Sequence, residues 1–362
     1  MLLELLSSNI HRMRSKICSL LFLFFIGTSM LFGQAKLPPK LKFHSLKVED
    51  GLPNNTINAI VQDSLGFIWI GTNDGLCRYD GKSFKYFKES LSKNSTISNN
   101  YIQSLFVDHK GDLWIMTDQG LNRYDPTTEQ IETYLAQTSS GLSYNSVTKM
   151  IQANDESYYI GTYGGGIDVF NQGEFTQNFS LDSQIPISSN LISDLQMQNE
   201  EKLWVGTYDS GIISINLNTG DVRNYDFGEN ALTLSRRINS IHLDRFGFLW
   251  IATDQGLSVL NTMDDTFFRL SEMNCKSLED DDLLVVFEDD EGKLWLGTRN
   301  SGLLSVSRKS LLANKHKVKF THYPPNGTDQ SVSHRSVSSL YEDVDGNIWV
   351  GTHPVSYTHL RA

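Results

Sequence analysis

A phrase of about 45 residues recurs along this chain, and no other feature limits its fold as strongly. Copies such as DSLGFIWIGTNDGL, DRFGFLWIATDQGL and DDEGKLWLGTRNSGL keep an acidic turn, an aromatic residue and a threonine in one order. The threonines follow one another at steps of 45, 45, 45, 46, 45 and 54 residues: Thr72, Thr117, Thr162, Thr207, Thr253, Thr298 and Thr352. A fixed period of this length predicts one supersecondary unit written many times.

One position of the repeat is always a large aromatic residue. All six tryptophans of the chain occupy it, and a tyrosine takes it in the third copy: Trp69, Trp114, Tyr159, Trp204, Trp250, Trp295 and Trp349. A large flat side chain that recurs at one position fills the space between neighbouring units. We therefore interpret these seven residues as core and not as a functional cluster.

Each copy of the repeat is predicted to form β-strands. In the first copy, residues 57–63 (INAIVQD) and 67–72 (FIWIGT) are short and rich in β-branched and aromatic residues. The DSLG between them predicts a turn, because Asp bonds nearby amides and Gly accepts positive φ. Residues 77–80 (CRYD) and 83–87 (SFKYF) complete four strands, and no helical periodicity of apolar residues is present. Four antiparallel strands per repeat predict the blade of a β-propeller.

The predicted fold is all-β: a single seven-bladed β-propeller over residues 41–353. The last blade is expected to be incomplete, with two strands of its own, and to be closed by the N-terminal strand. This expectation rests on the segment LKFHSLKVEDGLPNN, which resembles the end of each repeat. The segment SRKSLLANKHKVKF predicts a lengthened outer hairpin in the sixth blade.

Both ends of the chain depart from the repeat. In residues 1–35, basic residues precede an apolar run over residues 17–32, and small residues Gly33 and Ala35 follow, which predicts an export signal. A retained membrane anchor is the alternative, and Met13 is an alternative start to Met1. Residues 354–362 are expected to be a non-repeat tail of artefactual origin, on a chain that is a fragment of something longer.

The composition limits which partners, metals and cofactors this chain is expected to bind. The formal charge of −11 disfavours a phosphate backbone, so nucleic acid is not expected as a partner. Three cysteines are too few for a disulfide scaffold, and Cys77 and Cys275 are expected to be free. No metal-ligand spacing and no phosphate cradle is found, so we predict no catalytic residue, no metal and no cofactor.

Two positions of the repeat are predicted to line one face of the ring. The first lies at the entry to each inner strand, fourteen residues before the repeat aromatic: Asn55, Asn100, Asn145, Asn190, Arg236, Asp281 and Arg335. The asparagines have a structural explanation as turn residues that bond the backbone. The charged members, Arg236, Asp281 and Arg335, are ligand-binding candidates, with paired charges on a solvated rim as the alternative.

The second position directly follows each threonine: Asn73, Asp118, Tyr163, Tyr208, Asp254, Arg299 and His353. Two neighbouring tyrosines, Tyr163 and Tyr208, offer aromatic faces to the C–H groups of a sugar. Asp118, Asp254 and Arg299 would bond its hydroxyls. Exposed tyrosines of no special function are the alternative. A polar column inside the ring is interpreted as scaffold: Asn58, Gln103, Thr148, Ser193, Asn239 and Ser338.

The phrase DxxGxLWIGTxxGL followed by RYD, and the opening FHSLKVEDGLPNNTINAIVQD, resemble the two-component regulator propeller repeat. The resemblance implies the N-terminal, exported sensing part of a Bacteroidetes hybrid histidine kinase and response regulator, located in the periplasm. It further implies oligosaccharide ligands, a possible homodimer of the full-length protein, and membrane and kinase parts that lie outside these residues.

We therefore predict a non-catalytic, periplasmic, ligand-sensing propeller. A secreted propeller enzyme, either a lyase or a glycosidase, is an alternative from another class. A protein-interaction scaffold that uses the loop face is a third. An enzyme would need histidine, glutamate or tyrosine and arginine side chains converging on one face.

Overall fold

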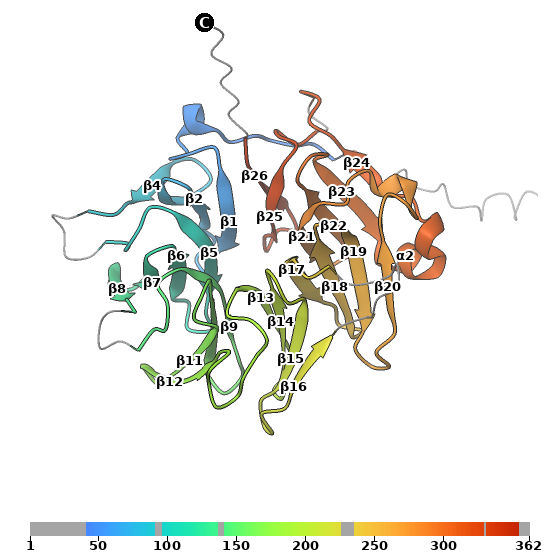
Figure 1. Ribbon diagram of the computed structural model, residues 1–362. Coiled ribbons are helices and arrows are strands. Elements are labelled where there is room, and N and C mark those ends of the chain that lie inside the picture. Colours follow the sequence, from blue (N-terminus) through green and yellow to red (C-terminus); the bar gives the residue numbers. More distant parts are fainter. Residues whose placement is uncertain (1–40, 91–95, 137–140, 226–234, 329–330, 355–362) are drawn as a thin grey trace, which may run out of the picture. The chain divides into compact units, whose positions relative to one another are not determined.

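The computed structural model describes residues 41–90, 96–136, 141–225, 235–328 and 331–354 (Figure 1). The described residues from Phe43 onward form one compact unit. The expected export signal and most of the expected tail lie outside the described residues. Among the described residues, no helix has the length and apolar character needed to cross a membrane.

Six antiparallel sheets of four strands each make up most of this unit, and in each the strands pair in chain order. The first three sheets comprise β1 (Ile57–Gln62), β2 (Ile68–Thr72), β3 (Gly75–Tyr79) and β4 (Phe84–Phe87); β5 (Ile102–Val107), β6 (Leu113–Thr117), β7 (Gly120–Asp125) and β8 (Gln130–Tyr134); and β9 (Val147–Gln152), β10 (Tyr158–Thr162), β11 (Ile167–Asn171) and β12 (Glu174–Phe179).

The next three sheets are built alike. They comprise β13 (Ile192–Asn199), β14 (Lys202–Thr207), β15 (Ile212–Asn216) and β16 (Val222–Tyr225); β17 (Ile238–Leu243), β18 (Phe248–Thr253), β19 (Gly256–Asn261) and β20 (Phe267–Leu270); and β21 (Leu283–Glu288), β22 (Lys293–Thr298), β23 (Leu303–Ser307) and β24 (Thr321–Tyr323). A further sheet has two strands, β25 (Val337–Glu342) and β26 (Ile348–Thr352).

The prediction of a seven-bladed propeller closed by the N-terminal strand is wrong, although the all-β class is confirmed. The structure has six four-stranded blades, and β25 and β26 form a sheet of two strands only. Residues 41–47 contain no strand, and only a 3₁₀ turn, η1 (Val48–Asp50), precedes β1. In every complete blade the fourth strand pairs with the third. No described strand lies beyond β26, so the third strand with which a fourth strand would pair is absent from the described part of this blade.

The acidic turn and the tryptophan of the repeat are one hydrogen-bonded unit. In the first blade, one carboxylate oxygen of Asp63 accepts the backbone N–H groups of Leu65 and Phe67, at 3.0 and 2.9 Å. The other oxygen accepts the indole N–H of Trp69 at 2.7 Å. Burying an indole without an acceptor would cost about 1–3 kcal/mol, so the turn and the core residue support each other.

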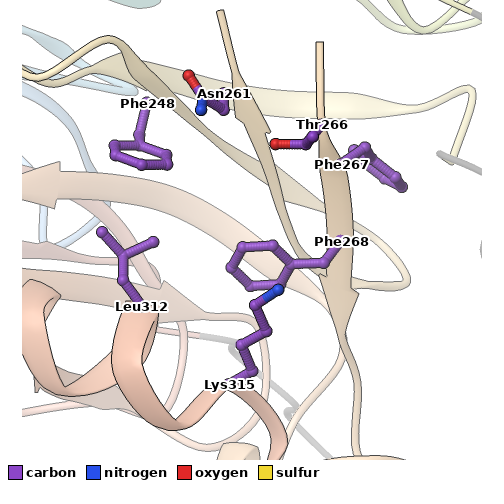
Figure 2. Close-up of a pocket in the computed structure, with 7 residues that line it drawn as sticks. All are labelled: Phe248, Asn261, Thr266, Phe267, Phe268, Leu312 and Lys315. Atoms are coloured by element: carbon purple, nitrogen blue, oxygen red, sulfur yellow. The ribbon is translucent and has the colours of Figure 1, made fainter. Parts of the chain in front are cut away.

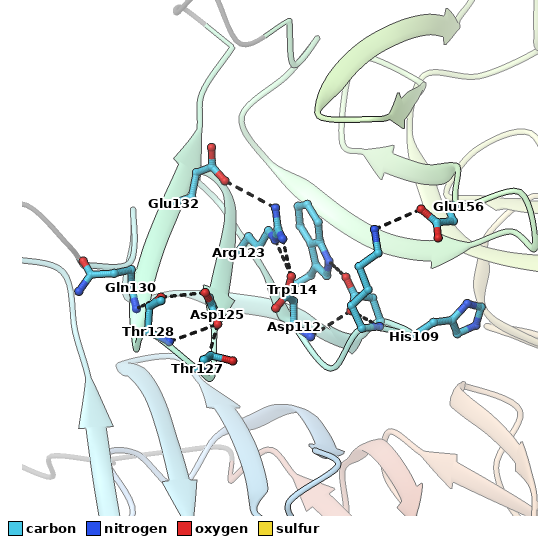
Figure 3. Close-up of polar contacts among 12 residues, drawn as sticks. His109, Asp112, Trp114, Arg123, Asp125, Thr127, Thr128, Gln130, Glu132 and Glu156 are labelled. Atoms are coloured by element: carbon cyan, nitrogen blue, oxygen red, sulfur yellow. Dashed lines mark hydrogen bonds and ion pairs between the residues drawn. The ribbon is translucent and has the colours of Figure 1, made fainter.

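The second blade repeats this arrangement and extends it outward (Figure 3). Trp114 donates its indole N–H to Asp108 at 2.9 Å. The guanidinium of Arg123, on the neighbouring strand, forms an ion pair with Asp112 at 2.6 Å and approaches Glu132 at 3.9 Å. It also lies over the Trp114 ring, 5.7 Å from the centroid, so the outer side of the indole is covered by a cation.

The inner strands β1, β5, β9, β13, β17, β21 and β25 contact one another in succession, and β25 contacts β1. The ring is therefore closed by packing (Figure 1). The glycine of the IGT phrase permits this packing: a Cβ on Gly71 would lie 2.6 Å from Ile102 of the next blade. The same relation closes the ring, where a Cβ on Gly351 would lie 2.9 Å from Ile57.

The segment expected to lengthen the outer hairpin of the sixth blade does lie between β23 and β24. It contains a short helix, α2 (Arg308–Asn314), and a 3₁₀ turn, η3 (Lys315–Lys317), rather than longer strands. A further 3₁₀ turn, η2 (Lys276–Leu278), precedes β21. Cys77 and Cys275 are both free and buried, and burial raises the pKa of the Cys77 thiol to about 12.

Candidate functional site

The two predicted ring positions do lie at one end of the inner strands, and backbone hydrogen bonds hold them together. In the first blade, the N–H of Gly75, in the turn between β2 and β3, donates to the carbonyl of Asn100 at 2.7 Å. Asn100 enters the inner strand of the second blade. The same bond joins successive blades at Gly120 and Asn145, Gly211 and Arg236, Gly256 and Asp281, and Gly302 and Arg335. We call this end of the ring the rim.

The asparagine column has a structural role. The side-chain oxygens of Asn55, Asn100, Asn145 and Asn190 accept backbone N–H groups of Val48, Glu89, Ala136 and Leu181, at 2.8–3.0 Å. Asp281 accepts the N–H of Glu272 at 2.6 Å in the same way, so its carboxylate replaces the amide of the other copies.

Arg236 and Arg335 differ from that column. Each gives its carbonyl to the glycine of the preceding blade, at 2.9 and 2.7 Å. Their side chains are exposed, and no hydrogen bond or ion pair joins them to another described residue. At these two positions only the backbone joins the blades, so the arginine side chains meet solvent and are available to a ligand.

Tyr163 and Tyr208 are in contact. Their ring centroids lie 5.4 Å apart at an angle of 65°, an edge-to-face arrangement. Tyr163 is 48% exposed, while Tyr208 is half-buried beneath the rim. Burial raises the pKa of Tyr208 to about 12, and the nearby carboxylate of Asp194 contributes in the same direction. The Tyr208 phenol is therefore neutral at physiological pH and can donate a hydrogen bond.

Two predicted carboxylates of the rim are already held by neighbours. Asp118 accepts hydrogen bonds from the amide of Gln103 at 2.7 Å and from the hydroxyl of Ser146 at 2.8 Å. Asp254 accepts the hydroxyl of Ser235 at 2.5 Å. In both residues these bonds go to Oδ1. The Oδ2 atoms can therefore still accept hydrogen bonds from solvent or a ligand.

The cation predicted in the sixth blade is paired. The guanidinium Nε of Arg299 lies 2.5 Å from Asp282, and its backbone N–H donates to the Asp282 carbonyl at 2.9 Å. His353 lies in the same part of the rim. Burial lowers the pKa of His353, and the charges of Arg299 and His334 add to this effect. The charge of Arg299 is thus balanced by Asp282, and lowering the pKa favours the neutral form of His353, whereas the tyrosine pair lies in the third and fourth blades.

The polar column inside the ring joins blades. Asn58, Thr148, Asn239 and Ser338 each donate to a backbone carbonyl of the next inner strand, at 2.7–2.8 Å. Gln103 bonds Ser146 and Asp118 instead, and the hydroxyl of Ser193 has no hydrogen-bond partner. Most of the column therefore acts as scaffold.

Two residues that were not predicted from the sequence, Tyr101 and Lys149, lie near the tyrosine pair, together with Arg237, which directly follows the candidate Arg236. Tyr101 is 39% exposed, and the positive charge of Arg237 lowers the pKa of the Tyr208 phenol, against the larger effect of burial. Lys149 forms an ion pair with the buried carboxylate of Asp194 at 3.1 Å. For Lys149 the available signal was a charged residue in an inner strand, at a position where most other copies have small or apolar residues.

A separate hollow of about 230 Å³ lies away from the rim, between the outer part of the fifth blade and α2 (Figure 2). Phe248, Phe268, Leu312 and the Lys315 side chain line it, and the Lys315 ammonium lies 4.9 Å from the Phe268 ring centroid. Asn261, Thr266 and Phe267 also line it, so its wall combines aromatic faces with two neutral polar side chains and one ammonium group. Within the described ranges, no group of three or more His, Cys, Asp or Glu residues could hold a metal ion.

Three segments of the chain match the two-component regulator propeller family: residues 51–74, 96–119 and 331–353. A segment of 55 residues is also 36% identical to part of histidine kinase P4 of Formosa agariphila. That match covers 15% of this chain and 4% of the kinase.

The fold of this chain is similar to that of several solved structures. The extracellular domain of a putative hybrid two-component system of B. thetaiotaomicron superimposes with a TM-score of 0.75 at 24% identity, covering 86% of this chain and 40% of that one. A second B. thetaiotaomicron extracellular domain gives 0.68 at 22%, covering 86% and 42%. Virginiamycin B lyase of Staphylococcus aureus gives 0.60 at 12%, covering 82% and 92%, which shows a shared fold and no more. The chain thus spans less than half the length of either B. thetaiotaomicron domain.

Proposed function

We propose that this chain, which carries two-component regulator propeller repeats, is a ligand-binding sensor region of a periplasmic signalling protein, and that its ligand is an oligosaccharide. The fold it shares with extracellular domains of two-component systems supports the sensing role. Phosphotransfer chemistry would belong to kinase parts of a longer protein, as the match to a histidine kinase suggests.

The observation that carries the ligand proposal is the tyrosine pair of the rim. Tyr163 offers an exposed ring face, and Tyr208 supports it from below at 5.4 Å. An aromatic ring held in this way presents a preformed surface to the C–H face of a sugar. Arg237 and the second carboxylate oxygen of Asp118 then supply hydrogen bonds to hydroxyls. The site thus combines an apolar ring face with polar groups beside it.

Calorimetric titration of the purified chain with oligosaccharides of defined linkage tests this proposal. Removing one stacking ring costs about 1.5 kcal/mol, so Tyr163→Ala should weaken the affinity for the best ligand about tenfold. Tyr208→Phe should have a smaller effect, because it keeps the ring and removes only the hydroxyl.

Tyr86→Ala is the matched control. Tyr86 is 52% exposed on the outer strand β4, away from the rim, and its loss should leave the affinity unchanged. If an oligosaccharide binds and Tyr163→Ala binds it as tightly as the wild type, the tyrosine pair is not the site. If no oligosaccharide of a broad panel binds, the ligand class is wrong.

A further inference from the structure

Tyr144 departs from a turn that the other six copies of the repeat share. In those copies, the residue before the strand-entry position carries a side-chain acceptor for the backbone N–H two residues further along the chain, at 2.7–3.3 Å. The acceptors are Asn54, Asn99, Ser189, Ser235, Asp280 and His334. A tyrosine cannot bond its own backbone in this way. The third blade therefore lacks a bond that stabilises the strand entry in the other six copies.

The Tyr144 ring lies on a glycine-rich turn of the same blade. A Cβ on Gly164 would lie 2.9–3.1 Å from three neighbouring ring carbons of Tyr144, closer than the about 3.5–4.0 Å of ordinary carbon contacts. Because the three distances are nearly equal, a face of the ring and not its edge rests on Gly164. A Cβ on Gly165 would lie 2.9 Å from the Cβ of Tyr144. The turns of equal length in the fourth and sixth blades carry Asp-Ser and Asn-Ser at these two positions, so the glycines make room for the tyrosine.

The residue before Tyr144 is fixed by a buried carboxyl group. Ser143 donates both its backbone N–H and its hydroxyl to Asp168, at 2.9 and 2.8 Å, and Asp168 is 2% exposed. In the second blade a neutral amide, Asn122, accepts the equivalent N–H of Ser98 at 2.9 Å. The loop of the third blade is thus held at Ser143, so Tyr144 is positioned although the turn bond is missing.

Tyr144 lies close to the tyrosine pair of the rim. Gly164, on which its ring rests, directly follows Tyr163 in the chain, and the Tyr163 N–H donates to the carbonyl of Ser146 at 2.8 Å. Tyr144 is 44% exposed and Tyr163 is 48% exposed. Each ring is supported from one side, Tyr144 by Gly164 and Tyr163 by Tyr208. Two supported aromatic rings with exposed surface therefore flank one short turn.

We propose, on the basis of the oligosaccharide-binding function proposed above, that Tyr144 forms a second aromatic subsite and makes the affinity of the rim depend on the length of the oligosaccharide. One sugar unit stacks on Tyr163, and another unit of the same molecule stacks on the outer face of Tyr144. The second contact strengthens binding because it is made within one complex. The third copy thus loses a turn bond where it gains an aromatic face, a local conflict that is typical of functional positions.

The variant Tyr144→Asn separates a binding role from a structural one. It supplies the acceptor that Asn54 and Asn99 provide, so the chain should unfold at a temperature equal to or above that of the wild type. Calorimetric titration with cello-, manno-, xylo- and laminari-oligosaccharides of two to six units measures affinity against length. The wild type should bind longer members more tightly, and Tyr144→Asn should bind the longest members about fivefold more weakly than the wild type. Tyr144→Phe, which keeps the ring, should restore most of that affinity.

Asn54→Ala is the matched control. It removes the same turn bond from the first blade, so it should lower the unfolding temperature and leave the affinity for every oligosaccharide unchanged. If Tyr163→Ala weakens binding but Tyr144→Asn binds the longest members as tightly as the wild type, the second subsite is wrong and the tyrosine pair remains the site. A lower unfolding temperature of Tyr144→Asn would show that the ring is structural and would also contradict the inference. If none of these oligosaccharides binds, this inference and the proposed ligand class are both wrong.

Discussion

At the scale of single residues, the tryptophan of the repeat and the residue six positions before it change together. Five tryptophans donate to an aspartate at 2.7–3.1 Å, and Trp204 donates to Gln198 at 2.8 Å. The third blade has Ala153 at the acceptor position and Tyr159 at the aromatic position. The same turn has Glu156 at φ 66°, where most copies have glycine. An indole in this core needs an acceptor, and the third blade has lost both partners.

This dependence predicts that Tyr159→Trp alone destabilises the chain by about 1–2 kcal/mol, since the buried indole N–H would lack an acceptor. Ala153→Asp alone should also destabilise, because it buries a carboxylate without its indole partner. The double variant should be more stable than the sum of the two changes by about 1 kcal/mol or more. Urea unfolding of the four proteins measures this coupling, and strictly additive effects would contradict it.

The candidate site divides at this scale into what sequence could and could not predict. Counting along the repeat predicted the rim positions, because equal positions of equal repeats reach one end of the ring. The roles of their side chains depend on partners from other blades. Asp118 is held by Ser146 of the next blade, and Tyr208 is influenced by Tyr101, two blades away. No local pattern reports such contacts.

At the scale of elements, the described strands of the first blade agree with those predicted from the sequence, whereas helix α2 was not predicted. The predicted strands at 57–63 and 67–72 are β1 (Ile57–Gln62) and β2 (Ile68–Thr72). Helix α2 is only seven residues long, too short to be stable on its propensity alone. Tertiary contacts fix it. Leu311 is fully buried, and the guanidinium of Arg308 forms an ion pair with Glu288 at 2.7 Å and lies over the Phe246 ring at 3.8 Å.

This buried ion pair predicts a large cost when only the cation is removed. Arg308 and Glu288 have side chains that are 7% and 9% exposed, and burial raises the pKa of Glu288 even beside the guanidinium. Arg308→Met should destabilise the chain by about 3 kcal/mol, because it leaves Glu288 and Asp244 buried without their cation. Arg308→Met with Glu288→Gln should recover part of that loss.

Thermal and urea unfolding of the single and double variants test this prediction. Arg223→Met is the matched control. Its ion pair with Asp265 has a similar length, 2.6 Å, but the two side chains are 59% and 40% exposed. Exposed pairs contribute about 0–1 kcal/mol, so this change should be nearly neutral. An equal loss of stability in Arg308→Met and Arg223→Met would show that burial does not decide the effect.

At the scale of the whole molecule, the ring closes without strand exchange between its ends. The period of the repeat predicted the ring, because each blade buries its face only against the next. It could not predict the closure, because the N-terminal segment resembles a fourth strand in sequence but has no third strand beside it. The seam between β25 and β1 relies instead on side-chain hydrogen bonds of the kind that join several other neighbouring blades. Ser338 donates to the carbonyl of Ile57 at 2.8 Å, and the N–H of Val344 donates to Gln62 at 2.9 Å.

These two bonds predict that the seam is the place where the ring opens first. The changes Ser338→Ala and Gln62→Ala together remove both, at a net cost of about 2 kcal/mol. Thr148→Ala and Gln152→Ala remove one equivalent bond from each of two junctions between blades that follow one another in the chain, at 2.8 Å between the third and fourth blades and at 2.9 Å between the second and third. The connecting chain keeps those blades adjacent when their bonds break, whereas residues 338 and 57 are far apart in sequence.

Hydrogen exchange should therefore accelerate strongly in β1, β25 and β26 of the first double variant, and only weakly in β5, β9 and β13 of the second. Similar acceleration at both places would mean that the seam is as stable as any other junction of the ring.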